Sequence, residues 1–127
     1  MNNAIPSVDS TSVTEFQKDL KRLAKFRHIE SDLEVAVKVI QAEPLNAARC
    51  YRAEGLGEDC STPVYVLKKF RSTDLRSTNE LRLVYGFSSS KNKIVLTEIY
   101  FKGDNEVEDK ARIRKYFADG SDFKIEM

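Results

Sequence analysis

Two apolar runs joined by a short polar connection constrain this chain more than any other feature. The runs are ELRLVYGF at 80–87 and IVLTEIYFK at 94–102, and SSSKNK lies between them. Branched and aromatic residues that alternate across two faces are typical of β-strands, and so short a connection favours an antiparallel hairpin. Both runs are apolar on both faces near their middle, which indicates central strands covered from two sides.

Charged residues interrupt these apolar runs at Arg82, Glu98 and Lys102. A charge within a covered strand must be paired or must reach an open side of the sheet. We therefore predict that Arg82 and Glu98 share one face, lie close enough to pair and border a cleft. Simple alternation along the second run also places Glu98 on the face that carries Ile94 and Leu96.

Length and composition indicate one soluble domain over residues 1–127. The chain is 41% hydrophobic and 32% charged, and its formal net charge is only +1. Any argument for nucleic-acid binding must therefore rest on where the charges lie. No apolar run approaches the ~20 residues that span a bilayer, and no basic segment followed by an apolar stretch opens the chain, so we expect a cytoplasmic protein without membrane contact. Cys50 and Cys60 are then expected to be reduced thiols.

Helical periodicity precedes the strands. Residues 1–11 are polar and without a period, so a loose tail is expected there. Apolar residues then recur at spacings of three and four from Val13 to Leu23, which predicts a helix. A second helix is predicted to open at the capping pair Ser31–Glu34 and to end before Pro44. The short connection between the two helices favours an antiparallel helical hairpin, which could cover one face of a small sheet.

The rest of the chain completes an α+β pattern. We predict a long loop over 44–63 with an edge strand near 48–52, and a further strand at VYVLKKF, residues 64–70. A last helix from about 106 to 117, capped by Asn105, precedes a tail over 118–127 that could hold a short strand at 123–125. Helices before and after a run of three to five strands predict an N-terminal helical hairpin on an antiparallel sheet, with a C-terminal helix.

This order of elements resembles the RelE/ParE superfamily of bacterial toxins from toxin–antitoxin pairs. The matching motifs are FQKDLKRL at 16–23, VYVLKKFRS at 64–72, LRLVY at 81–85 and EIYFKGD at 98–104, so the resemblance covers about residues 14 to 117. It implies a curved antiparallel sheet with helices packed on it. Several members of the superfamily cleave messenger RNA on the ribosome, and others poison DNA gyrase. Most are held inactive by an antitoxin protein that wraps the toxin.

The resemblance carries over to this chain one residue at a time. In the RNA-cleaving branch, the strand that matches VYVLKKF supplies basic residues to the cleft, and Lys68 matches one of them. Two residues earlier this chain has Val66, so a basic group is missing there, although Lys69 could partly replace it. The arginine of the LRLVY strand is Arg82, and the basic position at the end of the last strand falls at about Lys102.

RNA cleavage without a metal needs a base for the 2′-hydroxyl, an acid for the leaving oxygen and positive charge for the crowded phosphate. Guanidinium groups match phosphate oxygens bidentately, so Arg82 is the predicted phosphate ligand, and Lys68 and Lys102 would complete a basic cleft. Glu98 could pair with Arg82 or act as the general base. We expect no metal and no other cofactor.

Further residues are predicted to bind RNA. Tyr100 could stack on a base or donate a hydrogen bond, and Lys69, Arg71 and Arg76 could contact backbone phosphates. An acidic run could instead bind Mg²⁺, but acids at the front of a helix explain it more simply. Its members are Glu98, Asp104, Glu106, Glu108 and Asp109.

The preferred interpretation is therefore the toxin of a toxin–antitoxin pair, an endoribonuclease, and so a hydrolase, that acts on mRNA with the ribosome. Its partners would be mRNA, the ribosome and a cognate antitoxin protein. Two alternatives remain: a gyrase poison without enzymatic activity, and a superfamily member of degenerate activity that serves as a binding module. Val66 and the near-neutral charge favour these alternatives, and Tyr116 is a poor positional match for the C-terminal tyrosine of the best-known nucleases.

Overall fold

The computed structural model describes residues 4–76 and 80–127, and it confirms the α+β class. The elements are β1 (Ser7–Asp9), α1 (Thr14–Arg22), a 3-10 turn (Leu23–Lys25), α2 (Ile29–Ala42), β2 (Cys50–Arg52), β3 (Val64–Leu67), β4 (Leu81–Ser88), β5 (Lys93–Phe101) and α3 (Lys110–Phe117). Two helices thus precede the main run of strands and one follows it, as the sequence predicts.

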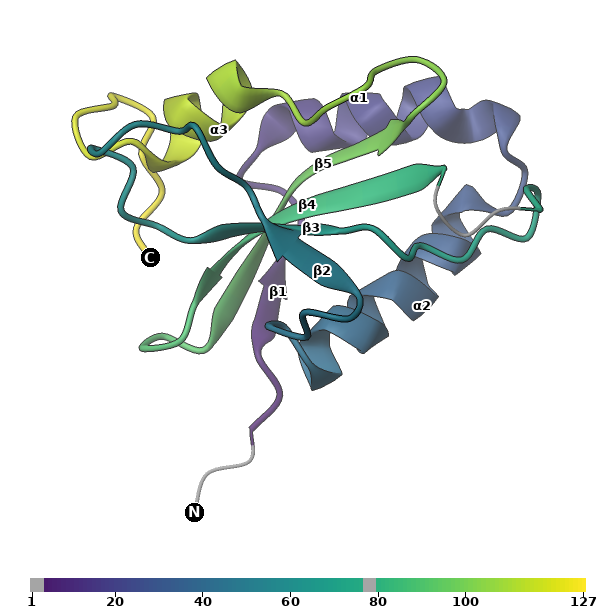
Figure 1. The fold of residues 1–127 in the computed structure, drawn as a ribbon, viewed down its shortest axis with the longest axis horizontal. Coiled ribbons are helices and arrows are strands. Elements are labelled where there is room, and N and C mark those ends of the chain that lie inside the picture. Colours follow the sequence, from purple (N-terminus) through teal and green to yellow (C-terminus); the bar gives the residue numbers. More distant parts are fainter. Residues whose placement is uncertain (1–3, 77–79) are drawn as a thin grey trace.

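The strands form one sheet in the order β1-β5-β4-β3-β2 (Figure 1). β4 and β5 are adjacent and antiparallel, which confirms the hairpin predicted over 80–102. β3 pairs antiparallel with both β4 and β2. β1 runs parallel to β5, so the sheet is mixed, and the prediction of a wholly antiparallel sheet holds only for β2 to β5.

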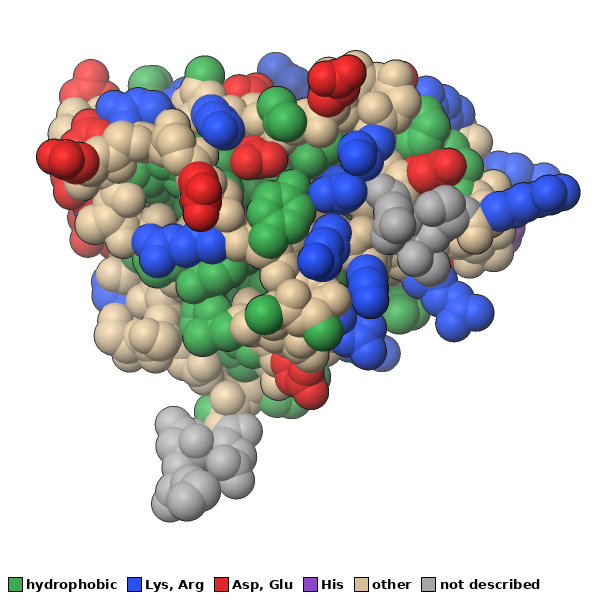
Figure 2. Space-filling view, viewed as in Figure 1, with side chains coloured by type: hydrophobic (Ala, Val, Ile, Leu, Met, Phe, Trp, Pro, Cys, Tyr) green, Lys and Arg blue, Asp and Glu red, His purple; other side chains and the backbone are tan. Residues whose placement is uncertain are grey.

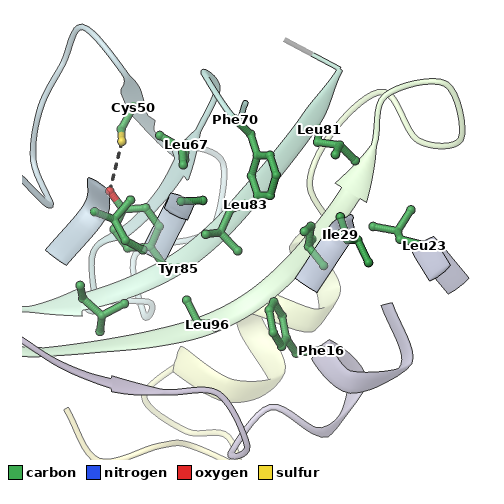
Figure 3. Packing of buried hydrophobic residues seen from close by; sticks show 14 of the residues in the cluster. Phe16, Leu23, Ile29, Cys50, Leu67, Phe70, Leu81, Leu83, Tyr85 and Leu96 are labelled. Carbon is green, nitrogen blue, oxygen red and sulfur yellow. Dashed lines mark hydrogen bonds between the residues drawn. The ribbon is translucent and has the colours of Figure 1, made fainter. Parts of the chain in front are cut away.

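Helices cover both faces of the sheet, and Figure 1 shows α2 and α3 on opposite sides of it. Leu83 and Tyr85 of β4 pack with Phe16 and Leu23 in one buried cluster (Figure 3). In that cluster the Tyr85 hydroxyl donates to the Cys50 sulfur at 3.3 Å. Cys50 and Cys60 are both free thiols, as predicted.

The second buried cluster lies under α3. Val64, Val66, Val84 and Val95 of the sheet pack there against Ile113, Tyr116 and Phe117. A Cβ atom on Gly86 would lie 2.8 Å from the Phe117 ring. The absence of a side chain at Gly86 therefore lets α3 approach the sheet closely.

An irregularity in the β4–β5 ladder changes which face the end of β5 presents. Val84 lies opposite Glu98 and Tyr85 lies opposite Leu96, so Thr97 is an extra residue in β5. Such a bulge shifts the alternation by one residue. Ile99 therefore follows Leu96 on the face under α1 and α2, while Glu98 joins the α3 face. The alternation predicted for Glu98 is wrong for this reason.

The N-terminal segment is more ordered than predicted. Residues 7–9 form β1, and the Ser7 amide donates to the Asn92 carbonyl at 3.0 Å. The Gln41 side chain of α2 donates to the Pro6 carbonyl at 3.0 Å. A strand of three residues is too short to show a period, so the sequence could not separate it from a loose tail.

Helix ends and the C-terminal tail also differ from the predictions. α2 begins at Ile29, ahead of Ser31, whose hydroxyl donates to the His28 carbonyl instead of capping the helix. α3 begins at Lys110, and its cap is Asp109, which accepts from the Arg112 amide at 3.0 Å. Residues 118–127, which are described throughout, contain no strand. The Ile125 amide instead donates to the Tyr116 carbonyl and turns the tail back onto α3.

Candidate functional site

Basic residues gather at one end of the sheet, where β2 and β4 begin and β3 and β5 end. The Lys68 amide there donates to the Arg49 carbonyl at 2.9 Å, and the Lys102 amide donates to the Glu80 carbonyl at 2.7 Å. Figure 2, drawn from the same side as Figure 1, shows Lys and Arg side chains clustered on the right half of this face. We call this region the basic end. It comprises Arg49, Lys68, Lys69, Arg71, Arg76, Arg82 and Lys102.

Contacts from α2 hold the loop that carries Arg71 and Arg76. The buried carboxylate of Asp32 accepts from the Thr73 amide at 2.7 Å and from the Thr73 hydroxyl at 2.6 Å. Asp74 accepts from the His28 amide at 2.9 Å, and one of its oxygens lies 3.0 Å from the His28 ring nitrogen. The loop is therefore anchored at its middle, and Arg71 and Arg76 extend from it into solvent.

Arg82 is half-buried on the α3 face, and β2 holds it in place. Its Nη1 donates to the Tyr51 hydroxyl at 3.2 Å, and its Cζ lies 5.8 Å from the centroid of the Tyr51 ring. The register that pairs Leu67 with Leu83 brings Lys68 beside Arg82 at the strand end. A hydrogen bond and a cation–π contact to one ring thus orient the guanidinium within the basic end.

Tyr100 lies opposite Arg82 on β5 and is 1% exposed. Its hydroxyl makes no hydrogen bond of ordinary geometry within the described residues, although the Tyr51 side chain lies near enough to interact with it. Burial raises the pKa of Tyr100, and the nearby Tyr51 and Glu108 raise it further, while Arg82 lowers it. A buried hydroxyl without a partner costs about 1–3 kcal/mol of folding free energy, so this atom needs an explanation.

Glu98 shares the α3 face with Arg82, as predicted, because its cross-strand partner Val84 is two residues from Arg82. The predicted ion pair is replaced by other contacts. A Glu98 carboxylate oxygen accepts from the Asp109 amide at 2.8 Å, where α3 begins. Burial raises the pKa of Glu98 to about 7, and the cation that opposes this rise is Arg112. Glu98 therefore supports α3, and we do not assign it as the base.

Asp19 and Arg112 form the centre of a buried polar network. Asp19 is fully buried on α1 and accepts from both terminal nitrogens of Arg112, at 2.5 and 3.1 Å. It also accepts from the Ile99 amide at 3.2 Å. This bond gives a partner to a backbone donor of β5 that lies beyond the three residues paired with β1. Arg112 donates to the Thr97 carbonyl at 3.0 Å. We call these contacts, together with those of Glu98, the Asp19–Arg112 network.

The acidic run does not assemble a metal site. Within residues 4–76 and 80–127, no three His, Cys, Asp or Glu side chains converge as metal ligands. Asp109 caps α3, and Asp104 lies 3.5 Å from the Lys25 ammonium. A hollow of about 520 Å³ opens beside Glu98, but Arg22 and Arg112 share its lining with the acids.

Tyr51 and Glu108 belong to the candidate site, although the sequence interpretation did not mention Tyr51 and considered Glu108 only as part of the acidic run. Tyr51 lies on the short edge strand β2, opposite the fully buried Val66. An aromatic ring therefore stands beside the position where the resemblance implies a basic group. Glu108 is buried, and its carboxyl group lies close enough to Tyr100 to raise the pKa of the Tyr100 hydroxyl. The placement of Tyr51 follows from the cross-strand register and that of Glu108 from the packing of the segment before α3, and spacing along the sequence contains no signal for either.

The chain matches no family model, no curated protein and no solved structure. The resemblance to RelE/ParE toxins therefore remains a prediction from its four motifs. None of the helices that the structure describes is both long enough and apolar enough to cross a bilayer.

Proposed function

We propose that this protein is the toxin of a toxin–antitoxin pair and cleaves messenger RNA at the ribosome, without a metal. The observation that carries the proposal is Arg82, a half-buried arginine that Tyr51 orients within the basic end of the sheet. Its position in the LRLVY motif agrees with the position implied by the family resemblance. Lys68, directly after β3, and Lys102, directly after β5, flank it.

The basic end suits the electrostatic part of RNA cleavage. A guanidinium that is already oriented pays little reorganisation cost when negative charge develops on a phosphate in the transition state. Lys68 and Lys102 add positive charge from the neighbouring strand ends, and Arg71 and Arg76 extend the surface along which an RNA backbone could lie. The proposal assigns binding and charge stabilisation to these residues.

The decisive experiment induces expression of the wild-type protein, of Arg82→Ala and of Arg82→Lys, and then maps mRNA 5′ ends. We expect new 5′ ends with the wild type and ~100–1000-fold slower cleavage with Arg82→Ala. Arg82→Lys retains the charge but not the bidentate geometry, so its activity should be intermediate. Both variants should melt close to the wild type.

Two outcomes would overturn this function. A wild type that stops growth without new mRNA 5′ ends, and that induces a DNA-damage response, would instead indicate a gyrase poison. An Arg82→Ala variant that cleaves at the wild-type rate would show that Arg82 is not the phosphate ligand. Lys91→Ala removes an exposed lysine in the β4–β5 connection. This variant is the matched control and should cleave at the wild-type rate.

The proposal includes an antitoxin protein as the neutralising partner. It predicts that a small reading frame beside the gene encodes a protein that co-purifies with this chain and restores growth. Failure of every neighbouring product to bind would remove the toxin–antitoxin pair from the proposal, while the 5′-end experiment would still test the nuclease.

A further inference from the structure

We propose that the Tyr100 hydroxyl, beside Arg82, is a second hydrogen-bond donor to a bound phosphate. In the same proposal, the Tyr51 ring covers this hydroxyl until the phosphodiester of a single-stranded RNA displaces the ring. This inference rests on the proposed function and extends it, because it assigns a positioned donor and a side-chain cover to the same site.

The first argument is that Tyr100 has a hydroxyl where the fold does not use one. The ring lies in the cluster under α3, and the oxygen makes no hydrogen bond of ordinary geometry within the described residues, only a weaker interaction with the Tyr51 side chain. Phenylalanine would fill the same apolar space without an unsatisfied polar atom. Buried polar groups that serve the fold are almost always hydrogen-bonded, so a lone buried hydroxyl beside Arg82 indicates a partner that is supplied from outside.

The second argument is the direction of the two donors. Tyr100 and Arg82 are direct cross-strand partners, so their side chains leave the sheet on the same face and lie side by side. One phosphate has oxygens enough to accept from a guanidinium and a phenol together. Burial and the nearby Tyr51 raise the pKa of Tyr100, so the hydroxyl stays protonated at neutral pH and can donate.

The third argument concerns Tyr51, whose side chain lies close enough to the Tyr100 hydroxyl to raise the pKa of that group. Tyr51 lies on a strand of three residues, β2, which ends the order of the described strands next to β3. The Tyr51 hydroxyl accepts from Arg82, which is the interaction that an incoming phosphate oxygen would replace. The Tyr51 ring is half-buried at the margin of the cluster under α3, so it can rotate away while the buried members of that cluster stay in place. An aromatic ring released in this way can stack on an RNA base.

Glu108 is the opposing charge at this site. It is buried and acts on Tyr100, so it repels an anion that approaches the hydroxyl. Glu108→Gln should therefore increase the affinity for inorganic phosphate about 2- to 10-fold, since it removes one negative charge at short range. An affinity that stays the same would place the bound phosphate away from Tyr100 and overturn the inference.

The main test compares Tyr100→Phe with the wild type in the full chain. The probes are a short single-stranded RNA with 2′-O-methyl groups, which cannot be cleaved, and inorganic phosphate. We expect the melting temperature to rise by about 2–6 °C, because an unsatisfied buried hydroxyl is removed, and the affinity for both probes to fall about 5- to 20-fold. A variant that is more stable and binds as tightly as the wild type would overturn the inference.

A double-variant cycle tests the cover. Tyr51→Ala exposes the Tyr100 hydroxyl to water, so Tyr100→Phe should no longer raise the melting temperature in that background, yet it should still weaken phosphate binding. An equal rise in both backgrounds would show that Tyr51 does not cover the hydroxyl. A wild type that neither binds nor cleaves RNA overturns the proposed function itself, whereas an active wild type with an unaltered Tyr100→Phe overturns this inference alone.

Discussion

The α3 face of the sheet holds two polar clusters that differ in how completely their groups are hydrogen-bonded. In the Asp19–Arg112 network, Asp19 accepts from Arg22, from Arg112 and from the Ile99 amide, and Glu98 accepts from the Asp109 amide. Around Arg82, by contrast, the Tyr100 hydroxyl makes no hydrogen bond of ordinary geometry within the described residues. The first arrangement is typical of polar groups that stabilise a fold, and the second leaves a buried polar atom for which the fold itself offers no use.

The two clusters also connect different parts of the molecule. The Asp19–Arg112 network joins α1, β5 and α3, so it fixes the helices on the sheet. The Arg82 cluster joins side chains of β2, β4 and β5 at the end of the sheet. Changes in the network should therefore alter stability, and changes in the Arg82 cluster should alter binding. The following predictions test this division, from the largest expected effect to the smallest.

Asp19→Asn should cause the largest loss of stability. The substitution removes the charge that compensates Arg112, whose side chain is only 10% exposed. Breaking a buried ion pair from one side typically lowers the free energy of unfolding by about 3–5 kcal/mol. Urea unfolding of the variant and the wild type at neutral pH measures this difference.

Arg22→Ala is the matched control for Asp19. Arg22 also bonds Asp19, at 3.0 Å, but its side chain is 50% exposed. Its loss should change the free energy of unfolding by less than about 1 kcal/mol. If the two substitutions cost the same, the buried contact with Arg112 does not dominate the network.

Glu98→Gln should change how stability depends on pH. The pKa of Glu98 is about 7 in the folded protein, above its ordinary value of 4.5, because the group is buried. Between these values the folded state binds a proton that the unfolded state has released, so the stability of the wild type falls as pH rises from 4.5 to 7. A glutamine at position 98 cannot titrate in this pH range. The variant should therefore lack about 3 kcal/mol of the fall in the free energy of unfolding that the wild type shows.

Urea unfolding at several pH values between about 4 and 8 measures the Glu98 effect. Glu106→Gln, an exposed acid just before α3, is the control and should leave the pH dependence unchanged. A constant difference between wild type and Glu98→Gln across this range would mean that Glu98 stays ionised when folded.

The sequence predicted features that depend on local pattern and missed those that depend on pairing across the sheet. The β4–β5 hairpin follows from alternation and branched residues, and it is confirmed. The bulge at Thr97 is invisible along the chain, because an extra residue is defined only against the opposite strand. Likewise, FQKDLKRL has an amphipathic helical pattern, and nothing in it distinguishes the buried Asp19 from its solvated neighbours.

The candidate site was predicted to a similar extent. Arg82 stands out because an arginine within an apolar strand is unusual, and Lys68 and Lys102 follow from the ends of the strands. Tyr51 lies on a strand of three residues, whose register no period could reveal. The Glu98–Arg82 pair was predicted from a shared face. The Glu98 carboxylate instead accepts from the backbone amide of Asp109, the residue that caps α3.

Glu15→Gln should weaken the contact between α1 and α3 with a pH dependence opposite to that of Glu98. Although burial raises the pKa of Glu15, hydrogen bonds from Tyr116 and Lys115 lower it to about 2. The carboxylate therefore contributes stability above its ordinary pKa of 4.5, and that contribution is lost as pH falls from 4.5 to 2. Since the side chain is 26% exposed, we expect only about 1–2 kcal/mol.

Unfolding of wild type and Glu15→Gln at about pH 2 and pH 6 tests this contact. The difference should be present at the higher pH and small at the lower one. An equal difference at both pH values would attribute the effect to packing of the side chain rather than to its charge.

Lys68→Ala should have the smallest effect on stability and a measurable effect on RNA binding. Lys68 is half-buried beside Arg82, and its ammonium group has no role in the core, so the free energy of unfolding should change by no more than about 0.5 kcal/mol. If the ammonium contacts one phosphate, the logarithm of affinity for a single-stranded RNA should depend less steeply on the logarithm of salt concentration, by about 0.7.

The salt dependence distinguishes a defined contact from general attraction to a charged surface. Lys91→Ala removes the same charge from the β4–β5 connection, at the opposite end of the sheet from Lys68. If binding is confined to the basic end, Lys91→Ala leaves the slope unchanged, since counterions are released only where phosphates are neutralised. Equal slopes for the two variants would mean that RNA binds wherever lysines occur, and the contrast between the Asp19–Arg112 network and the Arg82 cluster would then have no bearing on function.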